Sequence, residues 1–180
     1  MRELGQVAGV LAAYDFSEFD VVVDIGGGRG HLLRAVLDAA PETSGVLFDL
    51  PHVIREVEGL ASERLTLAPG DFFQDPLPTG DAYLLMEVIH DWDDERSIAI
   101  LSAIRKAAPS HAKLLLIEQL IPPGDSPTWA KTLDIHMLFL LGGRQRTRDE
   151  YEVLLREARF ALQREIDAPG GISILEATPA

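Results

Sequence analysis

A glycine-rich segment near the start of the chain is the first place where the residues predict chemistry. Residues 24–30 read D-I-G-G-G-R-G and follow an apolar, β-branched run with the composition of a buried strand. Glycines at a strand-to-helix turn let the backbone approach a ligand closely, next to the free amides of a helix N-terminus. The dinucleotide pattern G-x-G-x-x-G does not fit, because its third glycine would fall at His31. A nucleotide-like cofactor other than NAD is therefore expected.

Two further acidic positions are expected at the same edge of the sheet as Asp24. Asp49 ends the second predicted strand, just before Leu50, and Asp71 follows the third within the segment Gly70-Asp71-Phe72. Open α/β sheets bind ligands at the carboxyl ends of their strands. There, Asp49 would accept hydrogen bonds from ribose hydroxyls, and residues 70–72 would contact an adenine amino group and one ring face. Each acid alone is more often a loop residue or a helix cap, but three on successive strands indicate one site.

The segment H-D-W at residues 90–92 directly follows the fourth predicted strand, which places His90 beside the cofactor. Imidazole titrates near physiological pH, so it can take the proton of a hydroxyl whose oxygen attacks a methyl group. A lone histidine is usually structural, but a position at the ligand-binding edge favours a general base.

Three acids at residues 93–95 raise the alternative of a metal site. Acids in the first turn of a helix cap its amides and complement its dipole, so we predict no metal here. Among the other histidines, His31 opens a helix and is expected to be exposed, whereas His52 and His111 are expected at the surface or in caps. His136 lies on an apolar helix face, where it would either border a substrate or only pack.

The elements that must position these groups alternate along the chain. Strands are predicted at 21–25, 46–48, 65–67, 82–86 and 114–117, and helices at 2–13, 30–40, 52–58, 93–108 and 128–141. Another helix begins at residues 147–150, which read as a capping box, and the chain closes with strands at 160–166 and 172–177 around a glycine turn. This order predicts an α/β, Rossmann-like fold. It has a mostly parallel seven-stranded sheet, a C-terminal antiparallel hairpin and helices on both faces.

The composition limits the function classes. The chain has 180 residues, no cysteine and a net charge of -13. The lack of cysteine excludes disulfides and thiolate zinc sites, and the negative charge argues against nucleic acids and anionic membranes as partners. The apolar runs are too short to cross a bilayer. A cytoplasmic domain that acts on a small molecule is therefore expected.

Six segments in this order resemble motifs of the caffeate and acetylserotonin O-methyltransferase family, whose class I fold binds S-adenosylmethionine (SAM). They are residues 24–30, 48–51, 70–73, 90–92, 117–119 and 142–147. The acidic positions agree with SAM, which carries a cationic sulfonium and an amino group but no pyrophosphate. The resemblance implies a SAM site formed by Asp24, Gly26, Gly28, Asp49, Leu50, Gly70, Asp71, Phe72 and Glu87.

The resemblance also assigns catalytic roles. It implies that His90 is the general base and that Glu118, at the end of the fifth strand, orients the imidazole and raises its pKa. Residues that contact the acceptor would be Asp91, Trp92, His136 and Met137.

The chain departs from the family pattern in three respects. Gln145 stands where a second glutamate is usual; glutamine can still hydrogen-bond the imidazole but cannot stabilise its positive charge. Met86 and Glu87 occupy the region where a basic residue is common. Residues 1–16 are interpreted as a linker helix and 17–180 as the catalytic domain, so the family's N-terminal dimerisation domain is expected to be absent. The expected protein partner is a second copy of this chain in a homodimer, or a separate chain that supplies the missing domain.

Three functions stay open at this point. The first is a SAM-dependent O-methyltransferase that acts on a hydroxyl of a small aromatic or polyketide-like molecule. The second is a relative that uses SAM for N-methylation, decarboxylation or hydroxylation, which Gln145 leaves open. The third is a truncated SAM-binding module with little or no activity.

Overall fold

The computed structural model describes residues 2–122 and 144–180, and within them a single mixed sheet organises the chain. The strands follow the order β3-β2-β1-β4-β5-β7-β6. Strands β1 to β5 pair in parallel, whereas β7 runs antiparallel to both β5 and β6. The strand bounds are β1 Val21–Ile25, β2 Ser44–Asp49, β3 Leu65–Pro69, β4 Ala82–Met86, β5 Lys113–Glu118, β6 Phe160–Ala168 and β7 Ile172–Pro179. The predicted fold class, with its C-terminal antiparallel hairpin, is confirmed.

The order of the strands creates a switch point between β1 and β4. From β1 the chain moves outward to β2 and β3, and then returns to place β4 on the other side of β1. The carboxyl ends of β1 and β4 therefore border the crevice where open α/β sheets bind ligands. The glycine-rich segment follows β1 and the H-D-W segment follows β4, so the topology brings both to this crevice.

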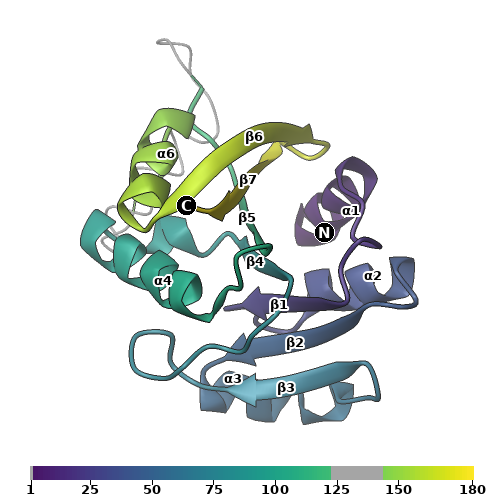
Figure 1. The fold of residues 1–180 in the computed structure, drawn as a ribbon. Coiled ribbons are helices and arrows are strands. Elements are labelled where there is room, and N and C mark those ends of the chain that lie inside the picture. Colours follow the sequence, from purple (N-terminus) through teal and green to yellow (C-terminus); the bar gives the residue numbers. More distant parts are fainter. Residues whose placement is uncertain (1, 123–143) are drawn as a thin grey trace.

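Helices cover both faces of the sheet, as Figure 1 shows with α1 and α2 on one side and α4 and α6 on the other. The helices are α1 Arg2–Ala13, α2 His31–Ala39, α3 Pro51–Glu56, α4 Asp94–Ala107 and α6 Arg148–Glu157, with 3-10 turns η1 Glu58–Leu60 and η2 Ile89–Asp91. Strands β1, β4 and β5 are almost wholly buried because both of their faces are covered. No helix in the described part of the chain is long and apolar enough to span a membrane.

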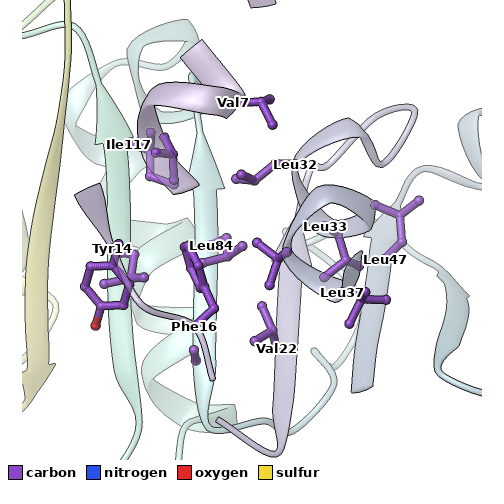
Figure 2. Close-up of a cluster of buried hydrophobic side chains, with 14 of the residues drawn as sticks. Val7, Tyr14, Phe16, Val22, Leu32, Leu33, Leu37, Leu47, Leu84 and Ile117 are labelled. Carbon is purple, nitrogen blue, oxygen red and sulfur yellow. The ribbon is translucent and has the colours of Figure 1, made fainter. Parts of the chain in front are cut away.

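The first helix is part of this packing. In Figure 2, Val7 of α1 lies beside Leu32 of α2, with Ile117 of β5 nearby. On another side of α1, Gly9 approaches the hairpin so closely that a Cβ atom there would lie 1.9 Å from the carbonyl oxygen of Pro169. The packing fixes α1 next to the carboxyl edge of β4 and β5.

Two predicted helices differ from or fall outside this description. The helix predicted at 52–58 begins at Pro51, whose fixed φ suits a first helical position, and ends at Glu56, before the separate turn η1. The predicted helix 128–141, which carries His136 and Met137, lies outside the described residues.

Candidate active site

The glycine-rich loop folds tightly against the ends of β1 and β2. Gly26 donates its N–H to the carbonyl of Phe48 (2.8 Å), and Gly28 donates to Oδ2 of Asp49 (2.8 Å). A Cβ atom on Gly27 would come within 2.5 Å of the Asp24 carboxyl group, and Gly28 has a φ of 56°, which favours glycine. The glycines therefore let the loop lie directly over Asp24.

Asp24 is a buried carboxylate whose hydrogen-bonding capacity is only partly used. Its exposed fraction is 1%, and within the described part of the chain its Oδ2 has no hydrogen-bond partner. Burial raises the pKa of Asp24 from 3.8 to about 7, and the neighbouring Asp49 carboxylate adds to this shift. A buried carboxylate is costly unless a donor or a cation compensates it, so Asp24 is prepared for a positively charged group.

Two cavities open at this edge, and they meet at Gly26 and Glu87, which line both. The first has a volume of about 440 Å³ and contains the acids Asp24 and Glu87 together with the bases Arg29 and His31. The second has a volume of about 300 Å³. Its lining comprises Gly26, Asp49, Leu50, Gly70, Asp71, Phe72, Phe73, Glu87, Val88, Asp91 and Trp92. All nine residues predicted to bind the cofactor thus line one of two adjoining cavities.

The second cavity combines aromatic walls with carboxylates. The rings of Phe72 and Phe73 meet edge-to-face with centroids 4.8 Å apart, and Phe73 contacts Trp92 in the same way at 4.9 Å. Asp49 accepts hydrogen bonds from Gly28 and from its own neighbour Leu50, and a carboxylate has room for further donors. An apolar slot with acceptors at its rim suits a flat base joined to a hydroxylated sugar.

His90 lies in η2 and is held by Glu118 at the end of β5. Its Nδ1 is 2.7 Å from Oε2 of Glu118, whose Oε1 accepts the N–H of Ile89 at 3.0 Å. Glu118 is fully buried, and the exposed fraction of His90 is 7%. When the ring is neutral and Nδ1–H donates to Glu118, Nε2 is free of a proton and can accept one. Nε2 lies 3.4 Å from a carboxylate oxygen of Asp91, which lines the second cavity.

The acids around His90 determine how readily it takes a proton. Burial alone would lower the pKa of His90, but the hydrogen bond and negative charge of Glu118 outweigh it. Asp91 and Glu87 add to this effect, and the pKa of His90 rises from 6.5 to about 8. His90 is therefore a stronger base than a free imidazole.

Sequence reasoning missed Arg146, which is fully buried beneath the His90 segment. Its guanidinium donates to the carbonyls of Ile89 (3.2 Å) and Trp92 (2.8 Å) and to Oδ1 of Asp94 (2.8 Å). Arg146 belongs to the motif at residues 142–147, but the motif alone does not reveal its role, because these three partners lie more than fifty positions away along the chain.

Two of the three acids that suggested a metal have other partners. Asp93 caps α4 by accepting the N–H of Arg96 at 2.8 Å, as predicted, and Asp94 pairs with Arg146.

Other predicted positions have mixed outcomes. His31, expected to be exposed, is half-buried and lines the first cavity with Arg29, which was not singled out at all. His52 is exposed, and His111 is exposed and pairs with Asp81 at 3.0 Å, in agreement with surface roles. Gln145 is buried, and its predicted hydrogen bond to His90 stays a prediction.

Known proteins resemble this chain in sequence and in fold. A sequence model described as the O-methyltransferase domain matches residues 4–161. Phenazine O-methyltransferase PhzM from Lysobacter antibioticus is 47% identical over 175 residues, which cover 94% of this chain and 51% of that protein.

Two solved structures add the fold. Human N-acetylserotonin methyltransferase, in complex with SAM, superposes with a TM-score of 0.90 at 29% identity, covering 97% of this chain and 52% of that one. An O-methyltransferase from neocarzinostatin biosynthesis (NcsB1), in complex with SAM and 2-hydroxy-5-methyl naphthoic acid, gives 0.85 at 35% identity, covering 96% and 53%. The chain spans about half the length of these relatives. It belongs to the O-methyltransferase family that includes the acetylserotonin enzymes.

Proposed function

We propose that the chain is a SAM-dependent O-methyltransferase that methylates a hydroxyl of a small aromatic or polyketide-like molecule, with His90 as the general base. The observation that carries the proposal is the 2.7 Å contact between His90 and the buried Glu118, next to Asp91 and Trp92, which line the second cavity. The named relatives act on phenazine and acetylserotonin, and NcsB1 holds a hydroxylated naphthoic acid.

The residues present fit SAM. The Oδ2 of Asp24, which has no hydrogen-bond partner among the described residues, suits a cationic group. The first cavity holds acids and bases, as the ammonium and carboxylate of an amino acid require. The second cavity offers Asp49 to ribose hydroxyls and the ring of Phe72 to adenine. Bound SAM would supply an electrophilic methyl group on a sulfonium sulfur.

His90 then acts on the acceptor. Its Nε2 removes the hydroxyl proton as the oxygen attacks the methyl group, and Glu118 stabilises the imidazolium that results. General-base assistance of this kind contributes roughly 10²–10⁴-fold in rate. Alignment of oxygen, methyl and sulfur supplies much of the remaining acceleration.

The test is turnover of SAM with a panel of phenols, together with SAM affinity measured by calorimetry. We expect His90→Ala to lower turnover by about 10²–10⁴-fold while SAM affinity stays within about twofold. His111→Ala is the matched control, because His111 is exposed and precedes β5 at the opposite edge of the sheet. Unchanged turnover in His90→Ala would contradict the assignment of the base.

The same assay separates the alternatives. SAM binding without turnover on any acceptor indicates the truncated binding module, and turnover on amines alone indicates the N-methylating relative.

Two further expectations stay predictions. One is a homodimer or a second chain that completes the acceptor site, and the other is a cytoplasmic location.

A further inference from the structure

Glu87 has an unusual backbone conformation for its residue type. It follows β4 with a φ of 55°, and Glu87 and Arg159 are the non-glycine residues with positive φ in the described ranges 2–122 and 144–180. Residues other than glycine and asparagine rarely adopt this backbone conformation, because it costs free energy. The N–H of Glu87 donates to the carbonyl of Ile117 at 2.9 Å, so β5 holds the backbone in place. Backbone strain of this kind is often retained where a side chain must point in one direction.

The side chain of Glu87 is held as firmly as its backbone. Its Oε1 accepts hydrogen bonds from the amide of Gln6, on α1, at 3.3 Å and from the amide of Gln119, just after β5. Both glutamines are buried, with exposed fractions of 2% and 5%. Because both amides converge on one oxygen, the carboxylate has a fixed position, and within residues 2–122 and 144–180 its negative charge is met by neutral donors and not by a cation.

The position of this carboxylate is the junction of the two cavities. Glu87 lines the first cavity with Asp24 and Arg29, and the second with Asp49 and Phe72. If the proposed function holds, the amino-acid part of SAM occupies the first cavity and the adenosine part the second. The sulfur atom joins these two parts, so the sulfonium of bound SAM must lie close to Glu87 at the junction of the cavities.

We propose that Glu87 recognises the positive charge on the sulfur of SAM and so distinguishes the methyl donor from its product, S-adenosylhomocysteine (SAH). This inference rests on the proposed function. When the methyl group moves from sulfur to the acceptor oxygen, the sulfonium becomes a neutral thioether, and the hydroxyl proton passes to His90. The attraction between Glu87 and the sulfur ends at that moment, which weakens product binding relative to donor binding.

Calorimetric dissociation constants for SAM and for SAH test this directly. We expect Glu87→Gln to weaken SAM binding about tenfold while SAH binding changes less than about threefold. A purely structural role would weaken both ligands equally, because SAM and SAH share the adenosine and the amino-acid part. Equal loss of both, or an unchanged ratio of the two constants, would overturn the proposal.

A second variant and a control complete the experiment. Glu87→Gly removes the carboxylate and also relieves the positive φ, so it is expected to fold and to show the same tenfold change in the ratio. Glu42→Gln removes one negative charge at an exposed position before β2, at the opposite edge of the sheet, and should leave the ratio unchanged. If the unaltered chain binds neither SAM nor SAH, the proposed function itself fails, which is a different outcome from an unchanged ratio.

Discussion

Two buried carboxylates, Asp24 and Glu176, occupy regions with opposite electrostatics. Glu176 accepts the hydroxyl of Tyr14 at 2.5 Å and the guanidinium of Arg164 at 2.9 Å, and Lys113 lies 3.8 Å away. Burial raises the pKa of Glu176, but these partners outweigh burial, and the pKa of Glu176 lies below its usual value of 4.5. Asp24 lacks a partner for its Oδ2 in the described part of the chain, and its pKa rises to about 7.

The difference separates a structural carboxylate from one that is ready for a ligand. Glu176 stabilises the fold above pH 4.5, and this contribution is lost as the pH falls through its lowered pKa. Asp24 behaves in the opposite way: the folded chain loses stability as the pH rises from about 4 to about 7, because the unfolded chain releases the Asp24 proton over this range while the folded chain retains it. A buried acid that lowers the stability of the fold near pH 7 is expected where a bound ligand supplies the positive charge that the carboxylate lacks.

Asp24→Asn should break this comparison most strongly. We expect SAM affinity to fall about 100-fold, because the amide cannot neutralise a cation in a buried site. The free chain should become more stable at pH 8 by about 1–3 kcal/mol, since the cost of ionising Asp24 disappears. Calorimetry and thermal unfolding measure the two effects. A variant that loses stability and keeps its SAM affinity would contradict the distinction.

Gly9→Ala affects α1. This helix lines the cavity of Asp24 through Val7, and it ends just before Tyr14, the partner of Glu176. A methyl group there would overlap the carbonyl of Pro169, so we expect a loss of about 2 kcal/mol in unfolding free energy, measured by denaturant titration. Gly5→Ala is the control, because no atom lies within 4 Å of its added methyl group and alanine favours the helix. The packing of α1 would be in doubt if both variants had the same stability.

Glu176→Gln should act on stability alone. The amide keeps a hydrogen bond to Tyr14 but loses its attraction to Arg164 and Lys113, so we expect a loss of about 1.5 kcal/mol at pH 7. The loss should shrink as the pH falls below 4.5 and the carboxylate of the parent chain becomes protonated. SAM affinity should stay within about twofold, and a larger change in binding would show that the two regions are coupled.

Glu118→Gln sharpens the role of the charge beside His90. In the parent chain, kcat/KM should rise with pH and level off above about 8, because only neutral His90 accepts a proton. Without the Glu118 charge, the midpoint should move down by about one pH unit or more, with a lower plateau. A pH profile with an unchanged midpoint would mean that another group is the base.

Much of the site followed from the sequence because its groups sit at the ends of strands. Asp24, Asp49 and His90 each follow or end an apolar run, and parallel strands bring such positions to one edge whatever the details of packing. The capping box at Thr147 was equally local and is confirmed.

The contacts that support the site could not be predicted in this way. Gln6 reaches Glu87 across 81 positions, and Tyr14 reaches Glu176 across 162. Such pairs depend on how α1 packs against the hairpin, which no local pattern encodes. The positive φ of Glu87 was also unexpected, since glutamate carries no preference for it.

The proton released when SAM binds tests the account most directly. Titration at pH 6 in two buffers of different ionisation enthalpy measures it, because Asp24, with a pKa of about 7, is mostly protonated there and must ionise to meet the cation. We predict that the parent chain releases about one proton more than Asp24→Asn does, and that its SAM affinity increases as the pH rises through 7. Equal proton release in the two chains, with SAM affinity that does not change with pH, would contradict the claim that Asp24 awaits a positively charged ligand.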